Sequence, residues 1–131
     1  MGITLYNRQR KIRLDLPRLQ RLAEAALAQC PGLGEVEVTF VSDAAIARVH
    51  REFMNVSGAT DVITFDHGEI VISPETVREN AAHYGRPPEE ELLRCIVHGF
   101  LHLSGYRDDT PADFATMHEV QEQTVRRVAG I

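Results

Sequence analysis

Hydrophobic and polar positions alternate in four short segments of the chain and recur with a helical period in five longer ones. The alternating segments predict four β-strands: ITLYN, EVEVTFV, DVITF and EIVIS. Turn residues 66–68 separate the last two, which are therefore expected to pair antiparallel. The helical spacing, with its capping and breaking residues, predicts helices from Pro17 to the CPGLG run, from Ser42 through Phe53, from Ser73 to Gly85, from Pro88 to Ser104, and from Thr110 through Val128.

This order of elements predicts an α/β (α+β) fold class, in which a small four-stranded mixed sheet is covered by about five helices. A chain of 131 residues is long enough to bury one hydrophobic core and too short for two. The sequence has no internal repeat and no linker between domains. We therefore expect residues 1–131 to form a single domain with one functional site.

The composition narrows the class of protein. No apolar stretch approaches the ~20 residues of a membrane helix, and MGITLYNRQRK lacks the apolar region of a signal peptide. The expected location is cytoplasmic, with no membrane partner. A net charge of −5 argues against indiscriminate nucleic-acid binding, although basic residues concentrated between positions 8 and 21 could form a local positive surface. Cys30 and Cys95 are predicted to be free, buried thiols, because neither belongs to a CxxC pair.

The stretch HGFLHLSGYRDD, residues 98–109, contains the candidate chemistry. His98 and His102 are four residues apart, so on a helix both can direct a nitrogen at one metal ion. Gly105 permits a positive-φ turn that can return Asp108 to the same face as a third ligand. Two histidines alone would more often be partly buried polar residues on a leucine-rich helix. The combined spacing, which matches the metzincin pattern with aspartate in the last position, predicts a metal site on a metzincin-like helix.

Gly99 decides the reaction class within that pattern. Metzincins have a glutamate directly after the first histidine as the general base for peptide hydrolysis, and this chain has glycine there. A peptidase is therefore disfavoured. Glycine inside a helix costs about 0.5 to 1 kcal/mol relative to alanine, which indicates either close approach of another group or tight helix packing.

The same stretch, preceded by TDVITFDHGEIVIS, resembles the YbeY family of metal-dependent endoribonucleases, whose hallmark is HGxLHLxGYDH. Upstream, HREFMNVSGATDVITF is similar to the NxxYR…PTDVLSF stretch of that family. The resemblance implies a hydrolase specific for single-stranded RNA that acts in 16S rRNA 3′-end maturation and ribosome quality control. It also implies a zinc-like ion (Zn²⁺, or another divalent transition metal), the small ribosomal subunit as partner, and no DNA substrate.

Two departures from the family pattern affect the site. The third ligand of the family is histidine, whereas this chain has Asp108, with the neighbouring Asp109 as a competitor. The family arginine after the tyrosine of NxxYR is replaced by Met54. The missing positive charge could come from Arg51, which we include among the catalytic candidates, or from Arg107.

With His98, His102 and Asp108 as ligands, the ion keeps an open position at which it can activate water for attack on a phosphodiester. Asp61, in the TDV element, either accepts a hydrogen bond from a ligand histidine or caps the following strand. Ser73 is predicted to be a helix cap. Two other functions remain open: a metal-dependent hydrolase of another ester, and a ribosome-associated assembly factor whose metal is structural.

The aspartate ligand leads to a first prediction. A carboxylate lowers the formal charge of a divalent site from +2 to +1, which raises the pKa of bound water relative to a site with three neutral histidines. The pH–rate profile of Asp108→His is therefore expected to move to lower pH than that of the natural protein. Rates measured against pH at verified metal content test this, and coincident profiles would contradict it.

Overall fold

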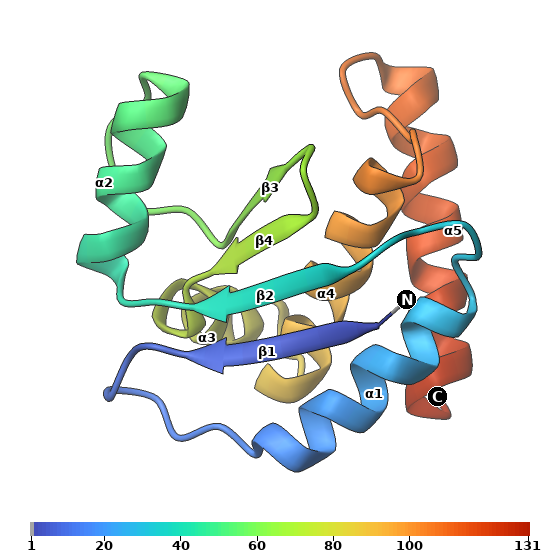
Figure 1. Ribbon diagram of the computed structural model, residues 1–131, viewed down its shortest axis with the longest axis horizontal. Helices are drawn as coiled ribbons and strands as arrows, with labels where there is room; N and C mark the ends of the chain where they lie inside the picture. The colour runs from blue at the N-terminus through green and yellow to red at the C-terminus, as the bar shows by residue number, and fades with distance from the viewer. Residues whose placement is uncertain (1) are drawn as a thin grey trace.

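The computed structural model describes residues 2–131 and contains four strands and five helices in that range (Figure 1). Their order is β1 (Ile3–Asn7), α1 (Leu16–Ala28), β2 (Val36–Phe40), α2 (Asp43–Met54), β3 (Val62–Phe65), β4 (Glu69–Ile72), α3 (Pro74–Tyr84), α4 (Pro88–Leu103) and α5 (Pro111–Ala129). The number, type and order of the predicted elements are confirmed.

The four strands form one mixed sheet in the order β1-β2-β4-β3. β1 and β2 are parallel, as are β2 and β4, and each of these parallel connections passes through a helix. β3 and β4 are antiparallel, with Val62 opposite Ile72 and Phe65 opposite Glu69, as the short turn between them predicts. The predicted four-stranded mixed sheet is therefore confirmed.

The two faces of the sheet are covered unequally. One face contributes Val38, Ile70 and Ile72 to the main core, which also contains residues of α1, α3, α4 and α5. The other face contributes Ile63 and Val71 to a small separate cluster with Ile46 of α2. Figure 1 shows α2 on its own side of the sheet, apart from α4 and α5. The large core therefore supports α4, whereas α2 is a peripheral element.

Helix α2 is also bound to the start of α3 through its first residue, Asp43. Ser73 and Thr76 of the α3 start donate their hydroxyls to Asp43 Oδ1 at 2.5 and 2.7 Å. Ser73 occupies the N-cap position of α3, as predicted. Its hydroxyl binds Asp43 instead of a backbone N–H of α3, so the predicted capping hydrogen bond is absent. The predicted caps at Ser42 and Thr110 are confirmed, because their hydroxyls accept from Ala45 N and Asp113 N.

Helix α4 is buried along most of its length because it lies between the sheet and the neighbouring helices. It packs against α1, α3, α5 and β3, and its residues from Glu91 to Val97 are all buried. Gly99 faces β4 so closely that an added Cβ would lie 2.5 Å from Ile70 Cδ1 and 2.9 Å from Ile70 Cγ1. Tight helix packing, one of the two explanations offered for this glycine, is therefore the reason for it.

Both cysteines are free and buried, in agreement with the prediction from their spacing. Burial raises the pKa of both thiols, so neither is a ready thiolate ligand or nucleophile. Among the helices of residues 2–131, none combines the length and the apolar character needed to cross a bilayer.

The Gly99 contact predicts that Gly99→Ala lowers the free energy of unfolding by about 1 to 2 kcal/mol. Two contacts below 3.0 Å place the cost of overpacking in the upper part of its usual range of about 1 to 3 kcal/mol, and the roughly 1 kcal/mol that alanine gains in a helix offsets part of it. Urea denaturation followed by circular dichroism measures the change. Gly34→Ala is the matched control, because nothing lies within 4 Å of its added Cβ.

A second substitution tests the cause of that loss. Ile70→Val removes Cδ1, the atom closest to the added methyl group, and should be less destabilising in the Gly99→Ala background than in the natural one. Strictly additive effects of the two substitutions, or a Gly99→Ala protein as stable as the natural one, would contradict the proposed contact.

Candidate metal centre

The candidate ligands come from the last two turns of α4 and the loop that follows it. His98 and His102 lie one turn apart on α4. Gly105 then adopts φ +101°, and Tyr106 N donates to Leu101 O at 3.0 Å, which closes the end of the helix. This turn reverses the chain, so Asp108 returns beside the two histidines as the spacing predicts.

The three side chains converge on one point. His98 Nε2 and His102 Nε2 are 3.1 Å apart, and Asp108 Oδ2 lies 3.7 Å from the first and 3.3 Å from the second. Ligands held about 2.0 to 2.1 Å from a tetrahedral zinc ion lie about 3.3 Å from one another. The three atoms thus have the separations of one face of such a tetrahedron.

The hydrogen bonds of the two rings determine which nitrogens carry protons. His98 Nδ1 lies 2.8 Å from Gln121 Oε1, and His102 Nδ1 lies 3.2 Å from the carbonyl oxygen of Tyr106. Both partners are acceptors, so each Nδ1 carries the proton in the neutral ring and each Nε2 presents a lone pair. Two lone pairs and a carboxylate facing one another repel unless a cation lies between them, and this donor set fits a divalent metal.

Gln121 is held in place by a charged network that joins α4 to α5. Its side-chain nitrogen donates to Glu122 Oε2 at 3.2 Å, which fixes the amide with its oxygen toward His98. Arg94 donates to both carboxylate oxygens of Glu122, at 2.7 and 2.9 Å, and also binds Glu90 and Glu91. Burial alone would raise the pKa of Glu122, but the hydrogen bond and charge of Arg94 lower the pKa below its usual value.

The structure separates the two aspartates that compete for the third position. Asp108 faces the histidines, whereas Asp109 Oδ2 accepts a hydrogen bond from Arg107 Nη2 at 2.8 Å. The hydrogen bond and charge of Arg107 lower the pKa of the Asp109 carboxyl, and Asp109 in turn raises the pKa of Arg107. Asp109 and Arg107 therefore form an exposed ion pair next to Asp108 in the sequence, and this pairing partly neutralises the charge of Arg107.

The structure places Arg51 away from the ligands and gives Asp61 the strand-cap role, one of the two alternatives predicted for it. Arg51 is an exposed residue in the last turn of α2, which packs on the face of the sheet away from α4, so the fold does not bring it to the ligands. Met54 ends the same helix. Asp61 does not accept from a ligand histidine among the described hydrogen bonds: its Oδ1 accepts from Val62 N at 2.8 Å, as a strand cap, and Gln121 has the position at His98.

Gln121 is the functional residue that the sequence analysis missed. It is 7% exposed and lies on the buried face of α5 with Met117 and Val125. A glutamine at the core-facing spacing of an amphipathic helix is the signal that could have identified it, since a buried amide needs a partner.

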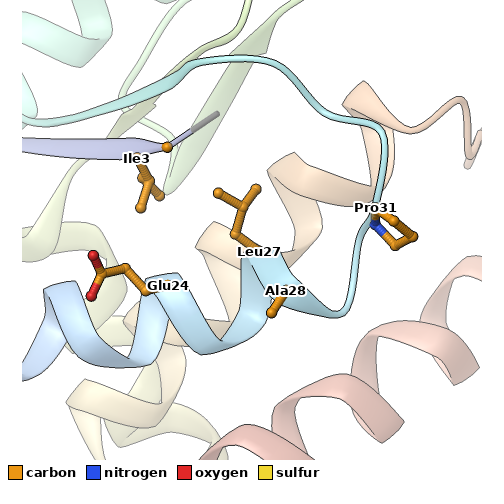
Figure 2. A pocket seen from close by; sticks show the side chains of 6 residues that line it. Ile3, Glu24, Leu27, Ala28 and Pro31 are labelled. Carbon is orange, nitrogen blue, oxygen red and sulfur yellow. The ribbon is translucent and has the colours of Figure 1, made fainter.

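Two cavities differ in their chemistry. One, of about 390 Å³, adjoins the ligands and is lined by residues of α4 and α5, including His98 and Gln121, with Asp108 from the loop between them. The other, of about 330 Å³, lies between β1 and α1, where Ile3 and Leu27 point toward each other (Figure 2). Glu24 is the one titratable group among its lining residues, so the candidate site lies at the first cavity.

The network around Gln121 predicts that Gln121→Met weakens zinc binding by about 10- to 100-fold. Methionine keeps the volume but removes the acceptor that orients His98, and loss of such a partner has an effect of this size. Titration against a chromophoric chelator measures the affinity. Gln123→Met, at an exposed position of the same helix, is the control and should bind zinc normally. Equal affinities for the two variants would contradict the role of Gln121.

Comparison with known proteins identifies the family. The family model described as "Endoribonuclease YbeY" matches residues 4–129. Endoribonuclease YbeY of Flavobacterium psychrophilum is 33% identical over 123 residues, which cover 88% of each chain. Endoribonuclease YbeY of Porphyromonas gingivalis is 34% identical over 125 residues, covering 86% of this chain and 83% of that one.

A solved structure agrees with these matches. The solution structure of TM1509 from Thermotoga maritima superposes with a TM-score of 0.74 at 31% sequence identity, covering 98% of this chain and 89% of that one. The fold is thus shared over nearly the whole chain, and the resemblance noted from the HGFLHLSGYRDD stretch is confirmed. The chain belongs to the endoribonuclease YbeY family.

Proposed function

We propose that this chain is a metal-dependent endoribonuclease that hydrolyses phosphodiester bonds of single-stranded RNA. Family membership supports the reaction and the substrate class. The observation that carries the proposal for this chain is the convergence of His98, His102 and Asp108, whose ligand atoms all lie within 4.8 Å of one another.

The exposure of the ligands favours a catalytic metal over a structural one. The side chains of His98, His102 and Asp108 are 27%, 29% and 40% exposed, so solvent and substrate reach the ligand atoms. Within residues 2–131 the metal-ligand cluster contains three donors, whereas structural zinc sites are closed by four. An assembly factor with a structural metal would need a fourth protein donor at this position.

Each residue has a defined part in this proposal. His98 and His102 present their Nε2 lone pairs, Gln121 and the Tyr106 carbonyl hold the rings in the required tautomer, and Asp108 adds a negative charge. We propose Zn²⁺ as the ion, since two imidazoles and a carboxylate in a tetrahedral arrangement suit it. When bound, zinc supplies a Lewis acid that polarises a phosphoryl oxygen and acidifies water for attack.

The cations near the ligands are already paired. Arg107 binds Asp109, and Arg94 binds three glutamates. Met54 supplies no charge in place of the family arginine. Stabilisation of the additional negative charge in the transition state therefore depends on the metal ion to a greater degree than in a site with a free arginine.

The finer parts of the proposal are supported by the family alone. We propose that residues 1–131 form a single catalytic domain and that the enzyme acts in the cytoplasm. We also propose that it matures the 3′ end of 16S rRNA and takes part in ribosome quality control, with the small ribosomal subunit as partner. The net charge of −5 accords with recognition of a particular RNA rather than indiscriminate binding.

The decisive experiment is cleavage of a labelled single-stranded RNA by protein loaded with zinc. We expect cleavage that a chelator abolishes, and a loss of at least about 100-fold for His102→Ala, because removal of a ligand removes the metal-dependent step. Denaturing gel electrophoresis measures the rate, and elemental analysis measures bound zinc in each variant. A duplex of the same sequence should be cleaved far more slowly.

The two neighbouring aspartates provide a matched pair of variants. Asp108→Asn should lose both zinc and activity, whereas Asp109→Asn should retain its zinc, because Asp109 is bound to Arg107 instead of facing the histidines. Full activity in the presence of chelator, or zinc retained by Asp108→Asn and lost by Asp109→Asn, would contradict the proposed site.

A further inference from the structure

Two exposed aromatic rings lie on the lining of the cavity next to the metal ligands. Tyr84, at the end of α3, is 62% exposed, and Phe114, in the first turn of α5, is 53% exposed. Both line the cavity of about 390 Å³ that also contains His98 and Asp108. These rings bury little surface in the fold, and beside the site they offer apolar faces to a bound ligand.

Each ring presents its face in an arrangement typical of stacking sites. The Phe114 ring lies nearly parallel to the imidazole of His118, with 5.7 Å between centroids and 14° between planes. The guanidinium of Arg86 lies over the ring of Tyr84, 5.4 Å from its centroid. Each ring thus already contacts one planar group, His118 at Phe114 and the Arg86 guanidinium at Tyr84, and more than half of each residue remains exposed.

The charges of the cavity argue against phosphate as the group bound there. Arg86 pairs with Glu91 at 3.2 Å, and Arg94 is bound by Glu90, Glu91 and Glu122. Asp61 and Asp108 add further carboxylates to the lining. An environment with this excess of acids repels a phosphodiester but accepts the neutral, planar part of a nucleotide, which also offers hydrogen-bond donors to carboxylates.

The two rings are separated along the axis of α4. Tyr84 and the Arg86 guanidinium over it lie at the Glu91 end of the cavity, whereas Phe114 lies in the first turn of α5, six residues after the ligand Asp108. Seven residues of helix separate Glu91 from His98, a rise of about 10 Å, which is greater than the thickness of one base. The Phe114 position is therefore suited to a base next to the cleaved bond, and the Tyr84 position to a base farther along the strand.

We propose that Phe114 is a positioning residue that stacks on an unpaired nucleobase adjacent to the scissile phosphate, with Tyr84 as a second stacking platform. This inference rests on the proposed function and adds a determinant of single-strand specificity. In a duplex both faces of each base are covered by neighbouring pairs, so the rings can engage a base only when the strand is unpaired. No bond is made or broken by either ring.

The test compares Phe114→Leu with the natural protein on a short fluorescein-labelled single-stranded RNA. We expect KM to rise about tenfold, as loss of one stacked base does, with kcat changed by less than twofold and zinc content unchanged. Phe114→Tyr, which retains an aromatic ring, should have the same KM as the natural protein. Tyr6→Leu, an exposed aromatic residue outside this cavity, is the control and should leave KM unchanged.

RNA that lacks one base separates stacking from a structural effect. In a set of oligonucleotides, each with a single abasic ribose, one position near the cleaved bond should raise the KM of the natural protein and have no effect on Phe114→Leu. An unchanged KM for Phe114→Leu would overturn the proposal. The proposal would also be overturned if Phe114→Leu had a raised KM but the abasic positions changed that KM as they change the KM of the natural protein. The defect would then be structural.

Binding of the same RNA to chelator-treated protein, followed by fluorescence anisotropy, distinguishes this inference from the proposed function. If the natural protein binds single-stranded RNA without cleaving it, and Phe114→Leu binds more weakly, the reaction is refuted and the stacking surface stands. If the natural protein cleaves RNA and both proteins bind equally, the reaction stands and the stacking surface is refuted. A protein partner on these rings would give the second result.

Discussion

The approach of two imidazole nitrogens and one carboxylate to a common point is the constraint on which the rest of the site depends. His98 Nε2 and His102 Nε2 are 3.1 Å apart, and in the neutral rings the proton of each lies on Nδ1. Such a cluster is unfavourable by itself, because no member donates a hydrogen bond to another. A divalent cation converts the repulsion into coordination, and the fold has to hold the three groups together until the cation binds.

The fold meets this requirement by placing α4 in the large core and fixing the free side of each ring. Gly99, between the two histidines, allows α4 to lie directly against Ile70 of β4. From the other side, α5 brings Gln121 to His98 through the network of Glu122 and Arg94. Breaking a buried charge network of this kind is strongly destabilising, so the network ties the geometry of His98 to the packing of α5.

The surroundings of the metal centre are acidic, which sets this chain apart from nucleases that bind RNA through a basic surface. Described cations close to the ligands are paired: Arg107 with Asp109, and Arg94 with its glutamates. Close to the ligands, a phosphate backbone would therefore find little to bind except the proposed metal ion. In the proposed complex, the exposed rings beside the ligands add affinity for the bases of RNA. Acidic neighbours do not weaken this contribution, because stacking does not depend on net charge.

Local patterns in the sequence determined much of this protein. Alternation of apolar residues and helical spacing gave the elements, and the turn at 66–68 gave the antiparallel pair, because both depend on neighbours along the chain. The spacing of His98, His102 and Asp108 around Gly105 likewise predicted their convergence, since one helix turn and one positive-φ glycine suffice to bring them together.

Contacts between distant segments could only be decided by the tertiary structure. Gln121 is 23 positions from His98. Asp61 lies near Cys95 of α4, but its Oδ1 accepts from Val62 N as a strand cap. Arg51 is carried away from the ligands because α2 packs on the opposite face of the sheet. A side chain's partner across the fold depends on how helices pack on the sheet, and that packing is set by the whole core rather than by any local run of residues.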